Sequence, residues 1–328
     1  MTGGEERSFA RRLLRGAGRL GLVALLLGTA LVLSARWFWV GELAASFAWY
    51  LGWCGVGGAL LLVVVGLRGS AAVALVLGLA LTWPELKLWL PADAAGELDP
   101  IREELVVASC NLLWDDPEMG GFLDLLERHD PDVVALQEVS IRNLPVPDFL
   151  TERYPYLALS PARERWNERT WGTAFLSRVP FTATTLVPPP EGTDRPVLEV
   201  ELEHAGSPVV LRNVHPMRPG KAWRIARRNQ VLDQLAGLEW GERGILLGDL
   251  NTTSTSPAFR DLVDATGLRD SRRGFGRQAT WTTSRHLPGL RVAIDHVLVG
   301  AAWHVVDRRT AGVLGSDHRA VIVRLAQP

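Results

Sequence analysis

Apolar residues are distributed along this 328-residue chain in two different patterns, which change near residue 96. Before that point the apolar runs are long, and the three longest are Leu20–Val40, Ala44–Leu67 and Ala71–Leu90. An α-helix needs roughly 20 apolar residues to cross a bilayer. The pattern therefore predicts a membrane anchor in residues 1–96, with about three transmembrane helices and a short linker, and a second domain in residues 97–328.

Arginines around the apolar runs predict how the anchor lies in the membrane. Several precede the first run, and Arg68 lies between the second and the third, whereas the loop at Glu42 has only Arg36 at its edge. Basic residues collect on the cytoplasmic side of membrane proteins. The N-terminus is therefore expected in the cytoplasm and the residues after Leu90 outside it, as in a multi-pass protein of the cell membrane.

Two alternatives stay open for this region. The third run is interrupted by Pro84, Glu85 and Lys87, and if it is only a surface helix the second domain would be cytoplasmic. The first run also has features of a cleaved signal peptide, with a weak cleavage site at Leu33–Ala35. The further runs that follow at once favour a permanent anchor.

In the second domain short apolar runs alternate with amphipathic segments. The runs predict β-strands, and they are Leu105–Leu113, Asp132–Val139, Gly172–Arg178, Val197–Glu203, Pro208–His215, Ile245–Leu247, Val292–Val299, Trp303–Arg309 and Ala320–Leu325. Helical spacing predicts helices at Gly121–Arg128 and Ala222–Leu238, and a further helix that begins near Ala258. Continuous apolar strands mixed with helices are typical of a layered α/β domain whose strands are buried on both faces.

Composition narrows the classes of function. The chain has 35 basic and 36 acidic residues, with 8 basic and 5 acidic before residue 97, so the second domain is mildly acidic and lacks the charge for a bulk electrostatic grip on nucleic acid. The two cysteines, Cys54 and Cys110, allow no disulfide framework and no thiolate metal site. The sequence has no glycine-rich nucleotide-binding loop and no G-x-S-x-G nucleophile motif, which excludes several enzyme classes.

The stretch Gly244–Asn251 is typical of a buried strand that ends at Gly248 and leads into a polar loop. Asp249 and Asn251 are two residues apart, so in an extended chain both side chains leave on the same face. An acceptor and a donor at the end of a buried strand suit a ligand, but an Asp/Asn turn that caps the following helix has the same sequence. This motif alone does not decide between the two readings.

Polar residues of the same kind lie at the ends of other predicted strands. The whole set is Asn111, Glu138, His215, Asp249, Asn251, Asp295, Asp317 and His318. A buried polar group beside an apolar run is costly unless it is paired or bound to metal. One such residue is usually a satisfied structural group, whereas a set at successive strand ends favours one shared site.

Taken in order, these residues resemble the motifs of the endonuclease/exonuclease/phosphatase superfamily. In this chain the matching motifs are Asn111, Gln137-Glu138, His215, Gly248-Asp-x-Asn251, Asp295 and Ser316-Asp-His318. The superfamily includes pancreatic deoxyribonuclease, apurinic endonucleases, inositol-phosphate phosphatases and neutral sphingomyelinases. The resemblance covers about residues 104–326 and implies a four-layer α-β-β-α sandwich of the deoxyribonuclease I type. The membrane runs ahead of it resemble the bacterial membrane-anchored branch, with the glycopeptide-resistance (VanJ-like) and YafD-like proteins.

The resemblance implies that these residues hydrolyse a phosphate ester with a metal ion. Glu138 would be the main metal carboxylate, with Asn111 and Asp317 nearby, in a site for one or two metals. Hard oxygen ligands without cysteine favour Mg²⁺ or Mn²⁺ over zinc. Asp249 would orient or deprotonate the attacking water, and Asn251 would donate a hydrogen bond to a phosphoryl oxygen.

The histidines carry separate expectations. His318, held by Asp295, resembles the second catalytic pair of the family, and His215 resembles the histidine that stabilises the pentacovalent state or protonates the leaving group. The carboxylate that partners this histidine in the deoxyribonuclease branch has no clear match in the sequence. His296 follows Asp295 on a strand and so points to the opposite face, where a structural role is expected.

The predicted function is that of a membrane-anchored phosphohydrolase that depends on Mg²⁺ or Mn²⁺ and has its catalytic domain on the extracytoplasmic side. By analogy and placement, an anchor beside such a site suits a lipid-linked phosphate or pyrophosphate, such as a polyprenyl carrier. A nuclease of the same fold is the nearest alternative, and nucleic acid is the less favoured partner because the acidic domain offers no flanking basic strip. A non-catalytic membrane receptor for a phospholipid or a protein is the alternative from another class, but it has no need of a full set of acid, base and metal residues.

Overall fold

The computed structural model describes residues 3–91, 103–113, 120–140, 148–161, 171–193, 195–283, 287, 289–312 and 315–327. The chain divides into two compact units. The helical unit comprises Met1–Lys87 and the short segment Ser254–Pro257, and the sandwich unit comprises Leu88–Thr253 and Ala258–Pro328. Most of the expected linker at residues 91–100 lies outside the described residues.

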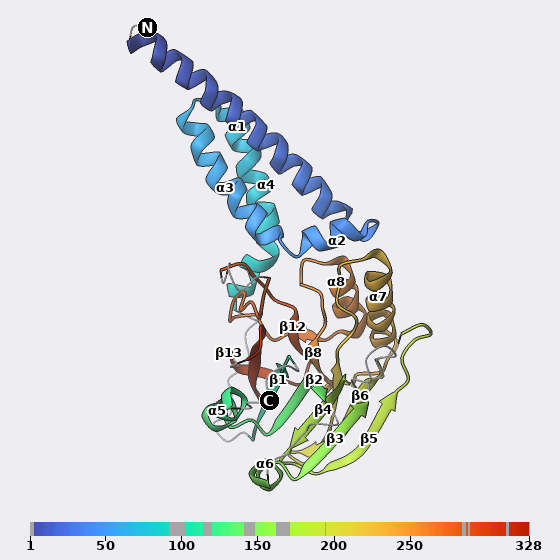
Figure 1. Ribbon diagram of the computed structural model, residues 1–328. Helices are drawn as coiled ribbons and strands as arrows, with labels where there is room; N and C mark the ends of the chain where they lie inside the picture. Colours follow the sequence, from blue (N-terminus) through green and yellow to red (C-terminus); the bar gives the residue numbers. More distant parts are fainter. Residues whose placement is uncertain are drawn as a thin grey trace. The chain divides into compact units, whose positions relative to one another are not determined.

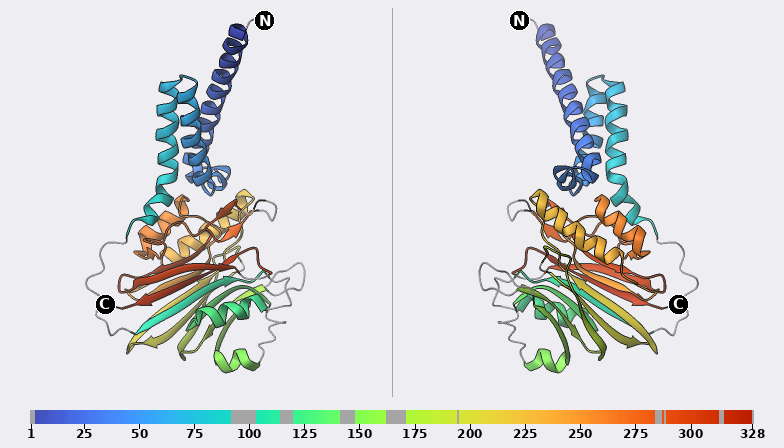
Figure 2. Two further views of the ribbon diagram at one scale, coloured as in Figure 1. Left: turned by 90° about the vertical axis from the view of Figure 1, so that its left-hand side faces the viewer. Right: turned by 90° about the vertical axis from the view of Figure 1, so that its right-hand side faces the viewer.

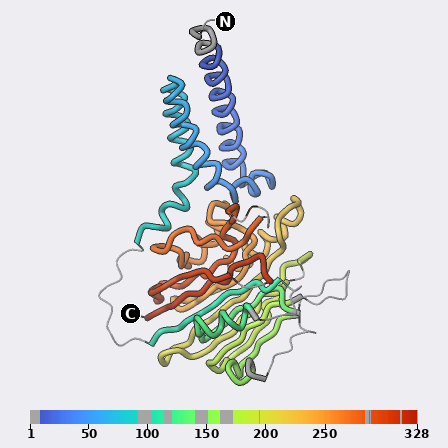
Figure 3. The backbone as a smooth tube through the Cα atoms, turned by 60° about the vertical axis from the view of Figure 1, so that its left-hand side comes forward, coloured from blue at the N-terminus to red at the C-terminus, as the bar shows by residue number. Residues whose placement is uncertain are grey.

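The helical unit is built from apolar helices joined by short connections (Figure 1). Its elements are α1 (Gly3–Leu33), the 3-10 turn η1 (Ser34–Arg36), α2 (Trp39–Ala45), α3 (Ala48–Val64), α4 (Arg68–Leu86) and the 3-10 turn η2 (Lys87–Trp89), which runs into the sandwich unit. The helices α1, α3 and α4 run side by side (Figure 3) and share an apolar cluster that includes Leu25, Leu62 and Leu81. α3 and α4 approach closely because glycines face each other, and a Cβ on Gly78 would lie 2.7 Å from the carbonyl oxygen of Gly52.

In the part of the chain that the structure describes, two helical stretches, Phe9–Arg36 and Arg68–Trp89, are long and apolar enough to cross a membrane. A third crossing exists only if α2 and α3 count as one span with a bend of 65° between them. The expectation of about three spans therefore becomes two candidates, or up to three.

The second expected run, Ala44–Leu67, is not one continuous helix in the structure. Its first residues complete α2, and two residues, Ser46 and Phe47, separate α2 from α3. Packing explains why α2 stands apart, since a Cβ on Gly41 would lie 2.6 Å from the carbonyl oxygen of Leu31. α2 packs closely against the end of α1, and it runs at an angle of 65° to α3.

The described part of the sandwich unit contains two six-stranded β-sheets and a two-stranded ribbon (Figure 1). The first sheet has the order β13 (His304–Gly312), β14 (Arg319–Ala326), β1 (Glu104–Asn111), β2 (Val133–Ser140), β4 (Trp171–Ser177) and β3 (Tyr156–Pro161). The second has the order β5 (Phe181–Val187), β6 (Val197–His204), β7 (Ser207–Val214), β8 (Ile245–Asp249), β12 (Asp295–Val299) and β9 (Arg269–Asp270). The ribbon pairs β10 (Trp281–Thr282) with β11 (Arg291–Val292), and the helices are α5 (Gly120–His129), α6 (Asp148–Arg153), α7 (Ala222–Ala236) and α8 (Pro257–Thr266).

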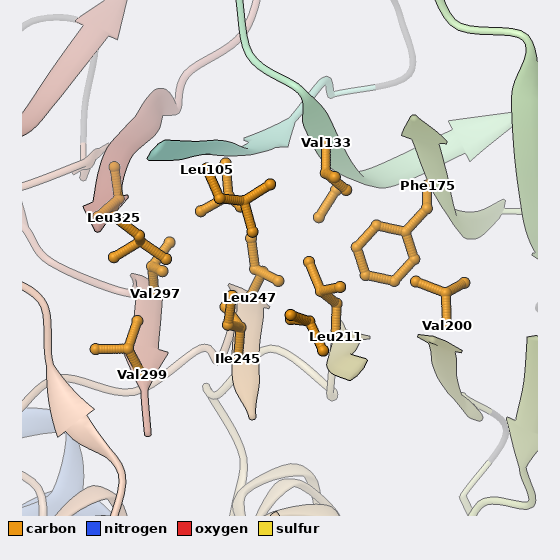
Figure 4. Packing of buried hydrophobic residues seen from close by; sticks show 14 of the residues in the cluster. Leu105, Val133, Phe175, Val200, Leu211, Ile245, Leu247, Val297, Val299 and Leu325 are labelled. Carbon is orange, nitrogen blue, oxygen red and sulfur yellow. The ribbon is translucent and has the colours of Figure 1, made fainter. Parts of the chain in front are cut away.

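The main core lies between the two sheets. Leu105 and Phe175 of the first sheet meet Leu211, Leu247 and Val297 of the second in one buried cluster (Figure 4). Alternate residues of these strands face away from it and form two outer cores, as the period of a strand requires. The central strands are therefore apolar on both faces, which explains their continuous apolar runs in the sequence.

Helices cover the outer face of each sheet (Figure 2). On the first sheet, Phe122 and Leu126 of α5 pack with Leu136. On the second, Leu232 of α7 and Phe259 of α8 belong to one cluster with strand residues. The structure thus confirms an α/β domain with two sheets, arranged as a sandwich with helices on both outer faces.

The sequence analysis did not predict β3, β5, β9, β10 or α6. The strand β5 lies at a sheet edge and carries only half-buried and exposed residues, so it lacks the apolar run that identified its neighbours. The expected strand Val292–Val299 is divided into β11 and β12. The break has a local cause: the backbone of Ile294 accepts a hydrogen bond from Leu250 and donates one to the Thr280 hydroxyl.

The strand pairing brings several strand ends to one edge of the sandwich. β1 and β2 are parallel, with Asn111 beside Gln137, and β7 and β8 are parallel, with Val214 beside Gly248. β12 runs antiparallel to β8 and places Asp295 opposite Asp249. Residues from distant parts of the chain consequently meet at this edge.

Candidate active site

Local backbone geometry aims Glu138 into the site. The pairing of β2 with β4 shifts its register between Leu136 and Val139, so Glu138 lies in a β-bulge. Its φ angle is 55°, in the left-handed region that non-glycine residues rarely adopt. A bulge of this kind redirects a side chain that a regular strand would point elsewhere.

The end of β8 is shaped by Gly248 and Asn251. Gly248 has a φ of 145°, and a Cβ there would lie 2.0 Å from the carbonyl oxygen of Val214, so only glycine fits beside β7. Asn251 has a φ of 50°, and its N–H donates to Asp249 Oδ1 at 2.9 Å. The buried Arg228 of α7 donates to the carbonyl oxygen of Asn251 at 3.0 Å. These contacts fix the Asp249 side chain and the Asn251 backbone, and the Asn251 side chain donates to the Pro216 carbonyl oxygen at 3.1 Å.

Asn111 lies between two carboxylates. Its Nδ2 donates to Glu138 Oε1 at 3.3 Å and to Asp249 Oδ2 at 3.1 Å. Its Oδ1 accepts from the N–H of Leu113 at 3.2 Å, which orients the amide. In this arrangement the Asn111 side-chain N–H groups donate to both carboxylates, and its oxygen accepts from Leu113. Asn111 therefore acts as a hydrogen-bond donor here and not as an oxygen ligand for a metal ion.

His318 and Asp295 form one corner of the site. The Nδ1 of His318 lies 2.9 Å from Asp295 Oδ2, and both side chains are buried. Burial by itself would lower the pKa of His318, but the negative charge and hydrogen bond of Asp295 outweigh it and raise the pKa to about 10. His318 is therefore a cation at neutral pH, and its Nε2 lies 3.8 Å from Asp249 Oδ2.

His215 forms the opposite corner, and its partner is a cation. Its Nε2 lies 3.6 Å from both Glu138 Oε1 and Asp249 Oδ2. The Arg195 guanidinium lies along the ring edge, with Nη1 2.9 Å from Nδ1 and 3.3 Å from Nε2, and it also donates to the His215 carbonyl oxygen. Burial and the Arg195 charge hold the pKa of His215 well below its ordinary value, so this ring is neutral.

Arg195 was missed by the sequence analysis. It lies in the loop before β6, with no strand end and no recognised motif to single it out. The structure supplies it as the partner of His215, where a carboxylate was sought.

The Asp249 carboxyl lies between the two corners. Burial raises its pKa to about 7, and the nearby Asp295 charge acts in the same direction. Three acidic groups, Glu138, Asp249 and Asp295, thus gather at one place, where His318 is the one cation among the described residues for which a direct contact is seen. Carboxylates that share a buried site favour a bound cation or a proton.

Asp317 and its neighbours close another side of the site. Asp317 Oδ2 accepts a hydrogen bond from the Trp281 indole N–H at 2.8 Å. Asp317 Oδ1 is buried and has no hydrogen-bond partner among the described residues. The hydroxyl of Ser316 donates to the Asn111 carbonyl oxygen at 2.7 Å, which ties this loop to the end of β1. Trp281 is a second residue that the sequence analysis did not consider.

Two groups of side chains are candidates for a metal ion. Asp249, Asp295 and His318 each place one ligand atom within 4.8 Å of the others. In that trio Nδ1 of His318 is hydrogen-bonded to Asp295, which leaves Nε2, 3.8 Å from Asp249 Oδ2, as the ring nitrogen that could face an ion. Glu138 and Asp317 are further candidates, because their carboxylate oxygens are hard donors of the kind that Mg²⁺ and Mn²⁺ prefer, and Asp317 Oδ1 has no hydrogen-bond partner among the described residues.

His296 occupies the opposite face of β12 from Asp295. Its Nε2 lies 2.9 Å from the Thr252 carbonyl oxygen, and its ring packs 4.5 Å from that of Phe259. Burial and the nearby Arg272 lower its pKa to about 4, so the ring is neutral. The structure keeps His296 away from the cluster, as the alternation of strand side chains predicts.

The chain after His215 is locally basic, which the overall charge balance conceals. Between His215 and Asp233 the sequence has five basic residues and no acidic one. Arg218 and Lys221 are exposed, and the guanidinium groups of Arg224 and Arg227 lie 5.3 and 5.0 Å from the ring of the exposed Trp223. Arg228 is buried, so the exposed and half-exposed basic residues that follow His215 in the sequence are Arg218, Lys221, Arg224 and Arg227.

Comparison with known proteins identifies the fold and its family. The profile of the Endonuclease/Exonuclease/phosphatase family matches residues 108–318. Among curated protein sequences, none matches the chain. Solved structures with the same fold include an endonuclease/exonuclease/phosphatase from Beutenbergia cavernae, with 21% identity, a TM-score of 0.58 and coverage of 69% of this chain and 72% of that one.

Two further solved structures are similar over almost their whole length. The 3′ phosphatase NExo from Neisseria, bound to a product DNA hairpin, has 21% identity and a TM-score of 0.55, and the match covers 67% of this chain and 98% of that one. The catalytic domain of human Nocturnin, with a bound sulfate, has 16% identity and a TM-score of 0.54 over 69% and 98%. At these identities the likeness concerns the fold.

Proposed function

The chain belongs to the endonuclease/exonuclease/phosphatase family, and on this premise we propose that it is a membrane-anchored, metal-dependent hydrolase of phosphate esters. The observation that carries the proposal is a cluster of five polar side chains, each of which lies within 4 Å of at least one other. The five are Asn111, Glu138, His215, Asp249 and His318. These residues come from β1, β2, the end of β7, β8 and the start of β14. A fold that only needed stability would not gather so many buried charges, because each costs free energy to desolvate.

The proposed cofactor is Mg²⁺ or Mn²⁺, held by Glu138 and Asp317, with Asn111 keeping Glu138 in place by its hydrogen bond. A bound divalent ion would neutralise charge on the phosphoryl oxygens and lower the barrier to attack by water. Asp317 Oδ1 has no hydrogen-bond partner among the described residues and lies 3.9 Å from His318 Nε2, and carboxylates crowd around Asp249; both observations support this assignment.

Asp249 and His318 divide the proton chemistry. Asp249 has an accepting carboxylate fixed by the Asn251 N–H, so it orients the attacking water and takes its proton. His318 is held protonated by Asp295 and stabilises the negative charge that develops on the phosphoryl group. The charged imidazole can also give its Nε2 proton to the leaving oxygen.

His215 and Asn251 act as neutral donors to the phosphoryl group. If Arg195 donates to Nδ1 of His215, the ring nitrogen nearer to it, the neutral ring carries its proton on Nε2, the atom that faces Glu138 and Asp249. Asn251 uses one Nδ2 hydrogen for the Pro216 carbonyl oxygen, which leaves the other for a phosphoryl oxygen. Neutral donors of this kind stabilise a pentacovalent phosphorus without proton transfer.

The proposed orientation puts the N-terminus in the cytoplasm and the catalytic domain outside. Contacts within the helical unit support it. Arg15 donates to the carbonyl oxygen of Val65 at 2.9 Å, so the basic part of α1 and the turn before Arg68 lie at the same end of the helices. That end is the cytoplasmic one by the distribution of basic residues.

A lipid-linked phosphate or pyrophosphate is the proposed substrate class. The short connection between the units supports it: α4 ends at Leu86, and the Leu88 carbonyl oxygen already accepts hydrogen bonds from Gly274 and Gly276 of the sandwich unit. If α4 crosses the membrane, the sandwich begins within a few residues of the bilayer surface. An anchor in the same chain as the catalytic domain suits a substrate that is itself held in the membrane.

A direct test uses the full chain in lipid nanodiscs. We expect hydrolysis of bis-p-nitrophenyl phosphate and of polyprenyl pyrophosphate with Mg²⁺ or Mn²⁺, and loss of both with a chelator. The Glu138→Gln variant is the matched control for contaminating phosphatases. Chelator-resistant activity that survives Glu138→Gln would contradict the metal mechanism. A reporter fused to the C-terminus tests the orientation, since activity only in the cytoplasm would overturn it.

A nuclease of the same fold is the second candidate. The exposed basic residues after His215 favour an anionic ligand that extends beyond the reacting phosphate, as a nucleic acid does. Cleavage of plasmid DNA by the wild type and not by Glu138→Gln, together with no turnover of polyprenyl pyrophosphate, would establish this reading. A receptor without catalysis would bind one of these ligands and hydrolyse none.

A further inference from the structure

A short part of the helical unit comes from the middle of the catalytic sequence. The segment Ser254–Pro257 groups with Met1–Lys87, whereas the residues before and after it belong to the sandwich unit. Only Thr252 and Thr253 separate this segment from Asn251. The chain therefore enters the helical unit immediately after the Asp-x-Asn motif.

Three hydroxyl groups bind this segment to the helices. Ser254 Oγ donates to Glu85 Oε1 of α4 at 2.8 Å, and Ser256 Oγ donates to Glu42 Oε1 of α2 at 2.5 Å. Thr255 Oγ1 donates to the carbonyl oxygen of Ala45, at the end of α2, at 2.6 Å. Glu42 and Glu85 are each only 4% exposed, so these contacts are shielded from water.

Burial makes these contacts strong. A carboxylate removed from water is costly unless it accepts hydrogen bonds, and hydrogen bonds to charged groups are the stronger class. Ionisable residues in an apolar helical region are usually there for function. Of the few acidic residues in the helical unit, two are used to hold the same four-residue segment.

The same contacts give the short helix α2 a role in holding the segment Ser254–Pro257. It has seven residues, too few to cross a membrane, but it presents Glu42 and the Ala45 carbonyl oxygen to one segment. Glu42 precedes α3 and Glu85 ends α4, and both meet this segment. Both acidic residues therefore lie at one end of the α3–α4 hairpin, and Arg68 lies in the turn at the other.

The backbone that links the segment to the site has little freedom to absorb a displacement. Thr252 and Thr253 are buried, and the Thr252 carbonyl oxygen lies 2.9 Å from Nε2 of His296. Asn251 is held in the left-handed region and donates its N–H to Asp249. A shift at Ser254 would be passed on to both residues of the Asp-x-Asn motif.

We propose that Glu42 and Glu85 are positioning residues for the hydrolysis reaction, acting through Ser256 and Ser254 on Asp249 and Asn251. The contacts of Glu42 and Glu85 with Ser254–Pro257 then matter for the reaction as well as for packing within the helical unit. This inference rests on the proposed function for its kinetic consequence, although its structural consequence can be measured without any substrate.

The kinetic test compares variants of the full chain in nanodiscs. Glu42→Ala and Glu85→Ala should each lower kcat about 10-fold, with KM within about 2-fold of the wild type, because the loss of a hydrogen bond to a buried charge disturbs orientation and not substrate binding. Glu42→Gln keeps an Oε1 acceptor for Ser256 and should restore most of the rate. Thr29→Val is the matched control, since Thr29 is a buried residue of α1 whose hydroxyl donates only to the Leu25 carbonyl oxygen.

A double-mutant cycle tests whether Glu42 acts through Ser256. Ser256→Ala should lower kcat by a similar factor, and the combination with Glu42→Ala should be no worse than either change alone. Independent effects that multiply would contradict a shared contact. Ser256→Ala and Ser254→Ala also remove only a hydroxyl, so they test the proposal if the Glu→Ala variants fail to fold.

Amide hydrogen exchange gives a readout that needs no activity. Glu42→Ala should speed exchange in residues 249–256 relative to the wild type, and Thr29→Val should not. Equal exchange and equal kcat in all variants would overturn the proposal, and so would a raised KM with unchanged kcat. A wild type that hydrolyses nothing, but shows the exchange difference, would contradict the proposed function and leave the positioning contact intact.

Discussion

The two histidine corners of the site contain the same residue type in opposite electrostatic surroundings. His318 has the carboxylate of Asp295 at 2.9 Å, and His215 has the guanidinium of Arg195 at the same distance. Both rings are buried, and both face Asp249. Burial lowers the pKa of either ring, but the Asp295 carboxylate outweighs it and raises the pKa of His318 to about 10, whereas the Arg195 charge adds to burial and holds the pKa of His215 well below its ordinary value.

The difference shows how one site obtains a charged and a neutral donor from two histidines. Burial disfavours the charged form of either ring, so a cation survives only where a carboxylate outweighs the cost of desolvation. At neutral pH the proposed site therefore has a proton donor at β14 and a fixed neutral donor at the end of β7. Each corner can be altered separately, which makes the comparison open to experiment.

The largest expected effect comes from Glu138, one of the two carboxylates that lie 3.6 Å from Nε2 of His215. Glu138→Gln removes a charge that would hold the metal, and we expect the rate of phosphate ester hydrolysis to fall by roughly 10³-fold or more, because Lewis-acid stabilisation is worth several kcal/mol. The measurement is kcat/KM in saturating Mg²⁺, with a melting curve to show that the protein remains folded. If Glu138→Gln is fully active with Mg²⁺ or with Mn²⁺, Glu138 does not hold a metal that the reaction needs.

The next largest effect concerns the charged corner. Asp295→Asn leaves the size of the side chain unchanged but removes the charge that keeps His318 protonated, so kcat should fall by about 10²–10⁴-fold at neutral pH. Nuclear magnetic resonance titration of His318 should show a pKa far below that of the wild type. If the rate falls while His318 stays protonated, the corner works by geometry and not by charge.

A smaller effect is expected at the neutral corner. Arg195→Ala should lower kcat/KM by about 10–100-fold, the usual worth of one charge-assisted hydrogen bond in a site. Arg195→Glu sharpens the comparison, because a carboxylate beside His215 should raise the pKa of this ring as Asp295 does for His318. Arg195→Lys keeps a cation and serves as the control. An unchanged pKa of His215 in Arg195→Glu would show that burial alone sets it.

The smallest effect on activity is expected at His296, which belongs to neither corner. Its pKa is lowered to about 4 in the folded protein, so the unfolded chain binds a proton more readily. The stability that this neutral ring contributes is fully present above pH 6.5 and is lost as the pH falls toward 4, by up to about 3 kcal/mol. His296→Gln should reduce this acid sensitivity in melting curves and leave the rate at pH 7 within about 2-fold.

The sequence predicted the parts of this protein that repeat a simple pattern. The central strands were found because burial on both faces requires continuous apolar runs, as at Leu105 and Leu247. The edge strand β5 and the two-residue strands were not found, because their residues are partly exposed or too few to form a pattern. The same reasoning identified the polar strand ends as a set, since each interrupts an apolar run.

By itself the sequence determined that apolar helices precede an α/β domain and which polar residues end its strands, because these follow from local periodicity. Only the tertiary structure decided that Arg195 accompanies His215, that Asn111 joins two carboxylates as a donor, and that Ser254–Pro257 groups with the helices. These are contacts between residues far apart in the chain, and no local pattern encodes them. The charge of each histidine depends on such contacts, so it too became known only from the fold.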